Sequence, residues 1–583
     1  MVANVMWKLI SYKPFLFIMN LIMWTIIYTL PLVPGLITKE FFDSLNGNSR
    51  FDLQSIIWAI ALVIAVLVRI AFVFLGNVID VKFRFKISSL VRKNILESIL
   101  FNVPGAQALN YSSKEAITYF RDDVDVIEDS ISWIIDLFGK ALFAILAFII
   151  MFNISPNIVI FVFLPLIAIV LIIQKASSKL NYIREQGREA TQQVLRRMGD
   201  LFNNIQSVKI EGAENNCINS LKELNSNREK WLVKDKTLNQ VLTSTNSTTI
   251  NLGTGLILLI SASGLRENSL TIGDFALFIY YLTFVSNFTL FFGQFLAQYK
   301  QTRVSIERLT NLSTGINYKS ITKKQKLTAS KKALNYERKK TVKKELEYME
   351  VQNLTFFYPQ SQNGLKDINF SIKRGTFNVI AGKVGAGKST LLKSIIGLFS
   401  LQKGQVFWNG QLINNPKDFF KPPISAYTPQ IPWFFSGTLK ENIIIDLVQA
   451  EKNLDQSLYF SNLSKDIPYL EDGLNTNIGS NAVKLSGGQA QRLSIARMLY
   501  REAELYVCDD ISSALDTETE RELWKRLKTQ FNTFLIVSHS KVAFEIADNI
   551  IVLDDGKIIA SGDLRELMES EDKRVLDVLG LEV

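Results

Sequence analysis

The sequence predicts a multi-domain protein: an all-α transmembrane domain of six helices, followed by an α/β domain. Apolar runs of membrane-spanning length fill the first half, whereas short apolar strands alternate with helical segments in the second. A glycine-rich run, 382–389, stands between such a strand and such a helix. With 583 residues, 48% of them hydrophobic, the chain is also too long for one ordinary core.

Six apolar stretches in the first half are candidate membrane spans. Each is close to the ~20 residues that a helix needs to cross a ~30 Å hydrocarbon layer. We expect spans near 14–37, 56–78, 131–151, 157–174, 247–263 and 274–297. The fifth is the weakest, because polar residues such as Asn251 and Thr254 dilute it.

Basic residues indicate the orientation of these spans. Lysine and arginine are concentrated in 79–130 and 175–246, whereas 38–55, 152–156 and 264–273 contain few. Under the positive-inside rule the N-terminus, the two long segments and the C-terminal half lie in the cytoplasm, with the spans in the cell (inner) membrane. The net charge of +10 is then explained by the membrane, and no nucleic-acid partner is expected.

The two long cytosolic segments carry helical patterning, so we expect the spanning helices to continue well beyond the bilayer. Both cysteines, Cys217 and Cys508, fall on the cytosolic side, which argues against a disulfide. Two charges lie inside apolar runs, Arg69 and Asp136. An intramembrane charge suggests a functional site; the alternatives are a structural Arg69–Asp136 pair or snorkelling toward the headgroups.

The domain boundaries follow from a change in composition. Residues 313–347 are rich in lysine and poor in apolar residues, which is typical of a basic, flexible connector. The expected domains are therefore a transmembrane domain over 1–312 and an α/β domain over 348–583. Attraction of the connector to anionic membrane lipids is an alternative to a merely solvated tether.

The run from Gly382 to Ser389 predicts a phosphate site. Strand, glycine loop and helix in this order let backbone N–H groups surround phosphate oxygens at the positive end of a helix. Lys388 is expected to reach the β- and γ-phosphates, and the Ser389 hydroxyl to bind Mg²⁺.

Four further features fit the same chemistry. Residues 485–489, Leu-Ser-Gly-Gly-Gln, form a second glycine-rich turn, placed before an amphipathic helix at 490–500. The apolar strand 505–510 ends in two carboxylates suited to Mg²⁺ and an attacking water. Gln430 follows another strand, and His539, the only histidine of the chain, ends a further one. A single histidine excludes His-rich zinc sites and leaves only this residue for a Ser–His triad.

Together these motifs resemble the ATP-binding cassette (ABC) family, and the resemblance covers nearly the whole chain. Residues 437–443 and 305–309 also match patterns of its exporters. Six spans ahead of one cassette are similar to an exporter of the half-transporter type. The resemblance implies a six-helix transmembrane domain followed by an α/β P-loop ATPase cassette, with ATP and Mg²⁺ as cofactors.

The resemblance also implies a role for each motif residue. The adenine would stack on Tyr358, and the phosphates would be held by Gly382, Gly385, Gly387, Lys388, Ser389 and Thr390. The ATP of a partner subunit would meet Ser486, Gly488 and Gln489, with Asp516 in the turn that crosses the dimer interface. Mg²⁺ would be bound by Ser389, Gln430 and Asp509, and the catalytic residues would be Asp510, His539 and Gln430. Turns near 110–116 and 209–217 would couple the membrane half to the cassettes.

Two departures from the family pattern matter. Asp510 stands where the family usually has a glutamate as catalytic base, and a ~1 Å misplacement can cost ~100-fold in rate. We therefore expect hydrolysis to be slow, or unequal between two sites. The stretch 476–482 lacks the charged residues that exporters carry before the family's signature turn, which is 485–489 in this chain. This puts the contact of 476–482 with the membrane half in doubt.

The expected function is ATP-driven export by a dimer of half-transporters, either a homodimer or a heterodimer with another half-transporter. Two composite sites would couple ATP binding and hydrolysis to alternating access. The substrate is unknown, with a lipid, a peptide and a drug-like small molecule all compatible with the apolar spans. The alternative is a regulatory or channel-like membrane protein that binds ATP with little turnover.

Overall fold

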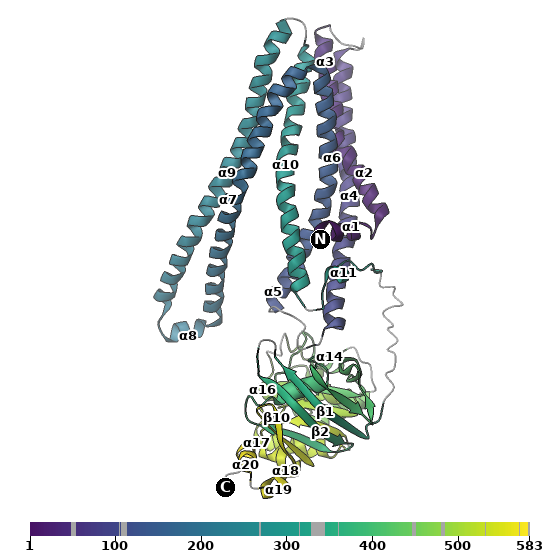
Figure 1. Cartoon of the computed structure of the whole chain (residues 1–583), viewed down its shortest axis with the longest axis vertical. Helices are drawn as coiled ribbons and strands as arrows, with labels where there is room; N and C mark the ends of the chain where they lie inside the picture. Colours follow the sequence, from purple (N-terminus) through teal and green to yellow (C-terminus); the bar gives the residue numbers. More distant parts are fainter. Residues whose placement is uncertain are drawn as a thin grey trace. The chain divides into compact units, whose positions relative to one another are not determined.

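The computed structural model describes residues 1–47, 54–103, 105, 113–266, 270–313, 315–327, 344–358, 361–445, 451–479, 484–530, 532–570 and 572–580. The chain divides into two compact units (Figure 1). The first contains Met1–Ile99 and Leu109–Leu327, and the second contains Leu100–Ala108 and Thr328–Val583. The secondary structure of the two units matches the predicted fold class: the first unit contains helices, and the second contains two β-sheets.

The described part of the first unit is built from helices, several of them long. In chain order they are α1 (Val2–Ile10), α2 (Pro14–Thr29), α3 (Leu32–Leu45), α4 (Ser55–Asn102), α5 (Ser113–Thr118), α6 (Val124–Ile154), α7 (Pro156–Asn203), α8 (Ile205–Ile210), α9 (Glu214–Arg266), α10 (Ile272–Asn311) and α11 (Tyr318–Ile321). A π-helical turn, Tyr119–Asp123, leads into α6. Helices α4 and α7 each have 48 residues and α9 has 53, more than twice the ~20 residues that cross a bilayer, which is compatible with the predicted continuation beyond it.

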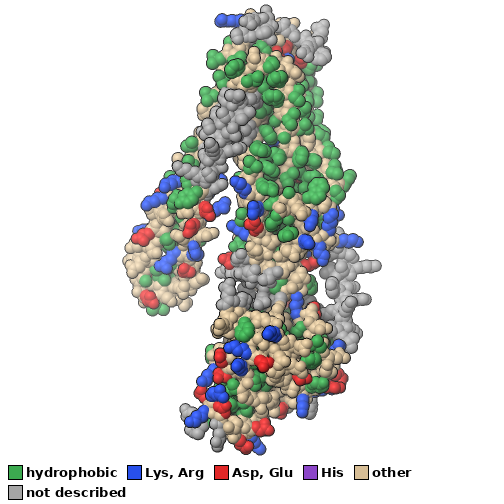
Figure 2. Space-filling view, in the orientation of Figure 1, with side chains coloured by type: hydrophobic (Ala, Val, Ile, Leu, Met, Phe, Trp, Pro, Cys, Tyr) green, Lys and Arg blue, Asp and Glu red, His purple; other side chains and the backbone are tan. Residues whose placement is uncertain are grey.

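Among the described residues, four segments are long and apolar enough to cross a membrane: Pro14–Leu45, Ser55–Asn102, Glu115–Ile154 and Ile272–Asn311. The predicted span 247–263 corresponds to a shorter apolar stretch, Asn251–Ala262, inside α9. The side chains of most of the span predicted at 157–174 lie outside the described residues, although its backbone belongs to α7. On the face seen in Figure 2, hydrophobic side chains cover the middle of this unit, and charged ones gather toward the α8 end.

The first predicted span is not one helix. Helix α2 ends at Thr29 and α3 begins at Leu32, with Pro31 as its N-cap residue. Proline lacks the N–H that a continuing helix would use, which explains the break.

Charged and polar side chains are buried between α2, α4 and α6. Asp80 accepts hydrogen bonds from Asn20 Nδ2 at 2.8 Å and from Ser132 Oγ at 3.1 Å. One turn further on, Arg84 pairs with Glu128 at 3.1 Å and also with Asp129. These contacts join three helices that are otherwise packed through apolar residues.

Arg69 and Asp136 do not form the ion pair that was one alternative for them. Asp136 instead lies near the Tyr28 hydroxyl. Lys140, one turn along from Asp136, places Nζ 3.5 Å from the centroid of the Phe291 ring. Among the described side chains, Arg69 Nε finds no hydrogen-bond partner.

The first part of the predicted connector is bound to the first unit. Asn94 Nδ2 donates to the carbonyls of Ile321 (2.7 Å) and Lys323 (2.8 Å), and Ser98 Oγ donates to Gly315 O (2.9 Å). The Tyr12 hydroxyl donates to Gln325 O at 2.7 Å. The expectation of a flexible tether from 313 onward is therefore wrong for 315–327, because buried polar side chains fix its backbone. Residues 314 and 328–343 lie outside the described part.

The second unit contains two β-sheets. An antiparallel sheet has the order β2 (Gly364–Lys373), β1 (Tyr348–Phe357), β4 (Lys403–Trp408) and β5 (Gln411–Leu412). The other has the order β10 (Lys557–Gly562), β9 (Asn549–Asp554), β3 (Phe377–Gly382), β8 (Thr533–Val537), β7 (Leu505–Asp509) and β6 (Ser425–Thr428). All its pairs are parallel except β9–β10.

The parallel sheet is buried on both faces, so its strands are continuous apolar runs. All six residues of β3 are buried: Ile380 faces the core shared with the antiparallel sheet, and Val379 faces the opposite core. The helices of this unit are α12 (Lys388–Ile395), α13 (Pro416–Phe419), α14 (Leu439–Ile444), α15 (Glu451–Phe460), α16 (Gly487–Leu499), α17 (Thr517–Lys528), α18 (Lys541–Ile546), α19 (Leu564–Glu569) and α20 (Lys573–Leu579). A separate core joins α14, α15 and α16.

Candidate nucleotide site

The topology of the parallel sheet brings the predicted phosphate-site residues to one edge. Strands β3, β8, β7 and β6 are adjacent and parallel, so their carboxyl ends lie along the same edge. Directly after them come the glycine loop, His539, Asp510 and Gln430 in turn. Crevices at this edge are where open α/β sheets bind ligands.

The glycine loop has the backbone that a phosphate cradle requires. Gly385 and Gly387 have φ of 90° and 102°, in the left-handed region that side chains disfavour. Gly387 is the N-cap residue of α12, whose first residue is Lys388. At Gly382 a Cβ would lie 2.5 Å from the carbonyl oxygen of Leu553, so the loop also needs glycine for close packing.

Two polar side chains of the loop, Lys388 and Ser389, contact identifiable partners. Lys388 is 7% exposed, and its Nζ donates to the carbonyls of Gly382 (2.7 Å) and Lys383 (2.8 Å). Burial lowers the pKa of Lys388, against the opposing charges of Asp510 and Asp509. Ser389 Oγ donates to Asp509 Oδ1 at 2.7 Å. A hydroxyl and a carboxylate this close supply the hard oxygen ligands that Mg²⁺ prefers.

Asp510 follows β7 in a constrained conformation. Its φ is 50°, which aspartate and asparagine tolerate better than most residues, and its N–H donates to Val537 O at 3.0 Å. The carboxylate accepts a hydrogen bond from Gln430 Nε2 at 3.1 Å. Burial raises the pKa of Asp510, opposed by the charge of His539 and by the Gln430 hydrogen bond.

His539 and Asp510 interact electrostatically across adjacent strands. Burial lowers the pKa of His539, and the Lys388 charge lowers it further, while Asp510 acts in the opposite direction. The imidazole is therefore neutral near pH 7 and offers one donor and one acceptor.

Tyr358 and Thr390 lie on the antiparallel-sheet side of the loop. The Tyr358 hydroxyl is 3.0 Å from Thr390 Oγ1, and its ring meets Phe356 and Phe399 edge to face at centroid distances of 5.2 and 5.7 Å. With 40% of its surface exposed, the Tyr358 ring remains accessible to an adenine.

The second glycine turn is part of a helix. Helix α16 begins at Gly487, three residues earlier than predicted, because Ser486 caps it. Ser486 Oγ accepts from Gln489 N at 3.3 Å, and Ser486 N donates to Gln489 Oε1 at 3.1 Å, a reciprocal capping box. The turn therefore presents Ser486 and Gly488 at a helix N-terminus.

Asp516 also caps a helix. Its carboxylate accepts from Thr519 N at 2.9 Å at the start of α17, and this hydrogen bond lowers the pKa of Asp516. The preceding turn is tied to α16, since Gln491 Nε2 donates to Ser513 Oγ at 3.0 Å and Ala514 N donates to Gln491 Oε1 at 3.0 Å.

The sequence did not predict two arginines of α16 that hold neighbouring loops in place. Arg497 of α16 donates to Trp433 O at 2.8 Å and to Asn442 O at 2.8 Å, which fixes the loop after Gln430. Burial lowers its pKa to about 10. An ion pair of α16, between Arg492 and Asp466, was missed as well. A cationic side chain on a helix that also packs a core is a signal that such a partner exists.

The predicted coupling turns are only partly described. Residues 110–112 lie outside the described part, and the segment that groups with the second unit is Leu100–Ala108. The other turn is formed by α8 and residues 211–213, slightly earlier than 209–217. In the stretch 476–482, Thr476 is buried and its carbonyl accepts from Leu439 N at 3.1 Å, whereas 480–482 are not described.

Comparison with known families agrees with this arrangement. Residues 12–288 match the family model of the ABC transporter transmembrane region, and residues 365–513 match the family model described as ABC transporter.

Curated relatives match over nearly the whole chain or over part of it. A putative export ATP-binding/permease protein of Rickettsia felis is 26% identical, over 98% of this chain and 97% of its own length. A probable multidrug resistance ABC transporter ATP-binding/permease protein of Bacillus subtilis is 37% identical over 37% of this chain and 38% of its own. Among solved structures, a bacterial Atm1-family ABC exporter with ATP bound superposes with a TM-score of 0.78 at 20% identity, covering 97% of this chain and 99% of that one.

Proposed function

Because the chain belongs to the ABC transporter family, with its membrane and ATP-binding domains fused, we propose that it is an ATP-driven exporter that works as a dimer of half-transporters. The observation that carries this proposal is the shared edge of β3, β8, β7 and β6, where Lys388, His539, Asp510 and Gln430 follow adjacent strands. The fusion with membrane helices distinguishes it from soluble members of the family.

ATP would bind at this edge, with its phosphates in the loop from Gly382 to Thr390 and its adenine on Tyr358. Mg²⁺ would be held by Ser389, Gln430 and Asp509. The 2.7 Å contact between Ser389 Oγ and Asp509 Oδ1 supports this assignment, because both oxygens are available in one place. When bound, Mg²⁺ neutralises developing charge on the phosphates.

The residues of this chain would divide the remaining work. Gln430 would hold the Asp510 carboxylate in place, and Asp510 would accept a proton from the attacking water. His539 would donate a hydrogen bond to the γ-phosphate. Since Asp510 is one methylene shorter than glutamate, its carboxylate would lie further from that water, and the proposed turnover is slow.

A dimer completes the site in this proposal. One chain contains one phosphate loop and one signature turn, so Ser486, Gly488 and Gln489 would meet the ATP held by the partner subunit, and Asp516 would line the interface. Both a homodimer and a heterodimer are compatible with this arrangement. This chain combines an intact signature turn with Asp510 in place of the usual glutamate, which favours a partner with a stronger catalytic site.

Alternating access in the cell membrane would follow from closing and opening of the two ATP-binding domains. The N-terminus and the ATP-binding domain would lie in the cytoplasm, as the basic segments indicate. A lipid, a peptide or a drug-like compound remains the proposed substrate class, since the exposed side chains of α4 are mainly apolar.

Asp510 also favours a second candidate, a regulatory or channel-like protein that uses ATP binding with little turnover. Stimulation of ATP hydrolysis by a transported compound separates the two, because a regulator would show none. A ligand-stimulated assay on the purified dimer in lipid nanodiscs therefore decides between them.

Two variants test the site itself in the same preparation. Lys388→Ala should weaken ATP binding by at least tenfold, because it removes the cation proposed to bind the phosphates. His539→Ala should leave ATP affinity within twofold and lower hydrolysis by about 100-fold, the usual cost of one positioned transition-state donor. An His539→Ala variant that hydrolyses ATP normally would contradict the assignment.

A further inference from the structure

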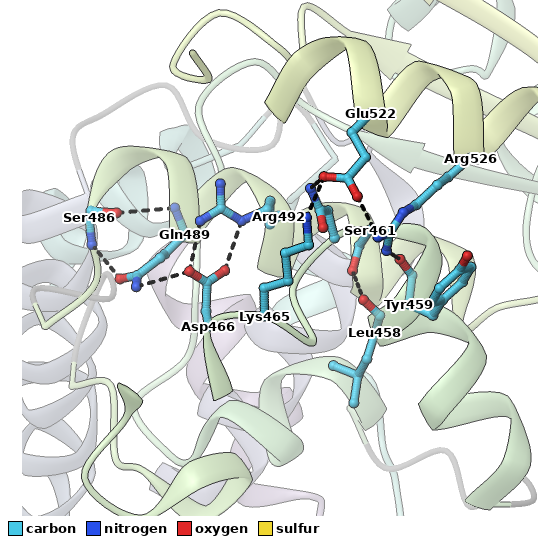
Figure 3. Close-up of polar contacts among 11 residues, drawn as sticks. Leu458, Tyr459, Ser461, Lys465, Asp466, Ser486, Gln489, Arg492, Glu522 and Arg526 are labelled. Carbon is cyan, nitrogen blue, oxygen red and sulfur yellow. Dashed lines mark hydrogen bonds and ion pairs between the residues drawn. The ribbon is translucent and has the colours of Figure 1, made fainter. Parts of the chain in front are cut away.

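A short loop, Asn462–Asp466, lies between the helices that carry the two motifs proposed to face the partner subunit (Figure 3). Helix α16 on one side begins at the signature turn, and helix α17 on the other has Asp516 as its N-cap residue. Side chains of this loop contact both helices.

Asp466 binds α16 through two side chains. Arg492 Nε donates to Asp466 Oδ2 at 2.8 Å, and Arg492 Nη2 donates to Asp466 Oδ1 at 2.9 Å, a bidentate ion pair. Gln489 Nε2 donates to the same Oδ1 at 3.3 Å. The two charged side chains are only 13% and 16% exposed, so this pair is more shielded from water than a surface salt bridge.

These contacts reach the signature turn directly. Gln489 is the residue that closes the capping box with Ser486. Arg492 lies against Gly488, since a Cβ built there would be 3.4 Å from Arg492 Nη1 and 3.2 Å from Ala514 O. The Asp466 carboxylate therefore neutralises and orients a guanidinium that borders the glycine expected to meet a phosphate.

The same loop is fixed to α17 on its other side. Glu522 Oε2 accepts from Asn462 Nδ2 at 2.8 Å and from Lys465 Nζ at 2.6 Å, while its Oε1 accepts from Arg526 Nη2 at 2.6 Å. The backbone of the loop is closed onto α15 by Leu463 N, which donates to Leu458 O at 3.0 Å. Asp466 thus projects from a segment that is itself held.

We propose that Asp466 is a positioning residue of the composite ATP site: by holding Arg492 and Gln489, it sets the signature turn in the geometry that receives the γ-phosphate of ATP bound by the partner subunit. The inference rests on the proposed function, which places Ser486 and Gly488 at that ATP. Without the carboxylate, the Arg492 cation is free to leave its place beside Gly488, and one hydrogen bond that fixes Gln489 is lost.

The test compares Asp466→Asn with wild type in the full-length dimer in nanodiscs. Closing of the two ATP-binding domains is measured as the distance between spin labels on Lys573→Cys, an exposed position on α20, in a Cys217→Ser background. A non-hydrolysable ATP analogue drives closing, and its affinity for the phosphate loop is measured in parallel. We expect the closed fraction to fall at least fivefold in Asp466→Asn, with the affinity of the phosphate loop within twofold of wild type.

Two further variants fix the interpretation. Asp466→Glu keeps a carboxylate and should retain most of the closing, because a bidentate pair with Arg492 can still form. Asp572→Asn is the matched control, since it removes the charge of another Asp–Arg pair at a helix N-terminus, 3.3 Å from Arg574, and should close like wild type.

Each contrary result is distinct. Normal closing in Asp466→Asn overturns the proposal, as does equal impairment in Asp466→Glu. Joint loss of closing, of analogue binding and of thermal stability in Asp466→Asn assigns a merely structural role and overturns it too. A wild-type dimer that binds the analogue without closing contradicts the proposed function itself, and the positioning role falls with it.

Discussion

The two parts of the candidate ATP site are positioned by different means. At the end of the parallel sheet, Lys388, Asp510 and His539 follow buried strands whose register fixes them through the main chain. At the signature turn, Ser486 and Gly488 occupy the start of a single helix, and side-chain contacts from Asp466 hold it. The first part therefore depends on the core, and the second depends on a few polar side chains.

This difference predicts where each kind of substitution acts. Changes at Asp510 and His539 should alter chemistry while ATP-driven closing persists, whereas changes around Asp466 should alter closing while the phosphate loop still binds ATP. The following predictions test that separation, beginning with the largest expected effect.

Asp510→Asn should lower ATP hydrolysis by at least 100-fold, because it removes the proposed general base. Asparagine tolerates the φ of 50° at this position, so the loop keeps its conformation. Steady-state ATPase assays and analogue-driven closing are measured side by side, with closing expected to equal that of wild type. Asp510→Glu serves as the comparison and should hydrolyse ATP faster than wild type; an unchanged rate in Asp510→Asn would remove Asp510 from the mechanism.

A second prediction concerns the acid limb of the pH–rate profile. The general base must be ionised, so activity is present above its pKa and is lost as pH falls through it. Burial raises the pKa of Asp510, which moves this loss above the pKa of about 3.9 of an ordinary aspartate. The profile of kcat/KM reports this group in the free protein, and the residual activity of Asp510→Asn should lack the same limb. If wild type and Asp510→Asn lose activity over the same acidic pH range, the acid limb belongs to another group.

The smallest effect is expected at Glu522, which fixes the far side of the Asp466 loop. Glu522→Gln should lower the free energy of unfolding by about 0.5–1 kcal/mol, since the ion pair between Glu522 and Lys465 is largely screened by solvent. The thermal midpoint of the second unit, followed by calorimetry, should fall by about 1–4 °C. Asp418→Asn, at an exposed pair with Lys421 (2.8 Å), is the control and should shift it less.

The stabilisation by Glu522 should depend on pH, because the pKa of Glu522 is lowered to about 2. The main cause is the hydrogen bond from Lys465, followed by those from Asn462 and Arg526. A lowered carboxyl pKa stabilises the fold above the unfolded value of about 4.3, and the gain is lost as pH falls from there to about 2. The difference between wild type and Glu522→Gln should therefore shrink over that range. A constant difference would mean that the charge is not its cause.

The sequence predicts the sheet edge well because motif and topology agree there. The glycine spacing of 382–389 and the apolar runs before Asp509 and His539 are local patterns, and parallel strands bring their ends together. Asp510 is recognisable as a substitution in this pattern, although its hydrogen bond with Gln430 is a tertiary contact and requires the structure.

Other features could not be predicted, because they depend on contacts between distant residues. Asp466 precedes Arg492 by 26 positions in a loop without a recognisable motif, so nothing in the sequence pairs them. Asn94 and Ser98 hold 315–323 through backbone carbonyls, which leave no signature in the sequence of the predicted connector. Pro31 could have indicated the break between α2 and α3. The residues around it are apolar, however, so hydropathy alone does not separate the two helices.

Helices α7 and α9 run side by side and are joined by α8 (Figure 1). Arg184 Nη2 donates to Asn239 Oδ1 at 2.6 Å, and the Tyr182 and Trp231 rings meet edge to face at 6.1 Å, so the two helices are cross-braced along the charged half of their length. With 53 residues, α9 extends about 80 Å. Such a braced rod acts as a lever: a tilt of about 5° at its apolar end would move α8 by about 7 Å. A rearrangement of side-chain size in the apolar half can therefore become a displacement of more than one helical turn at α8.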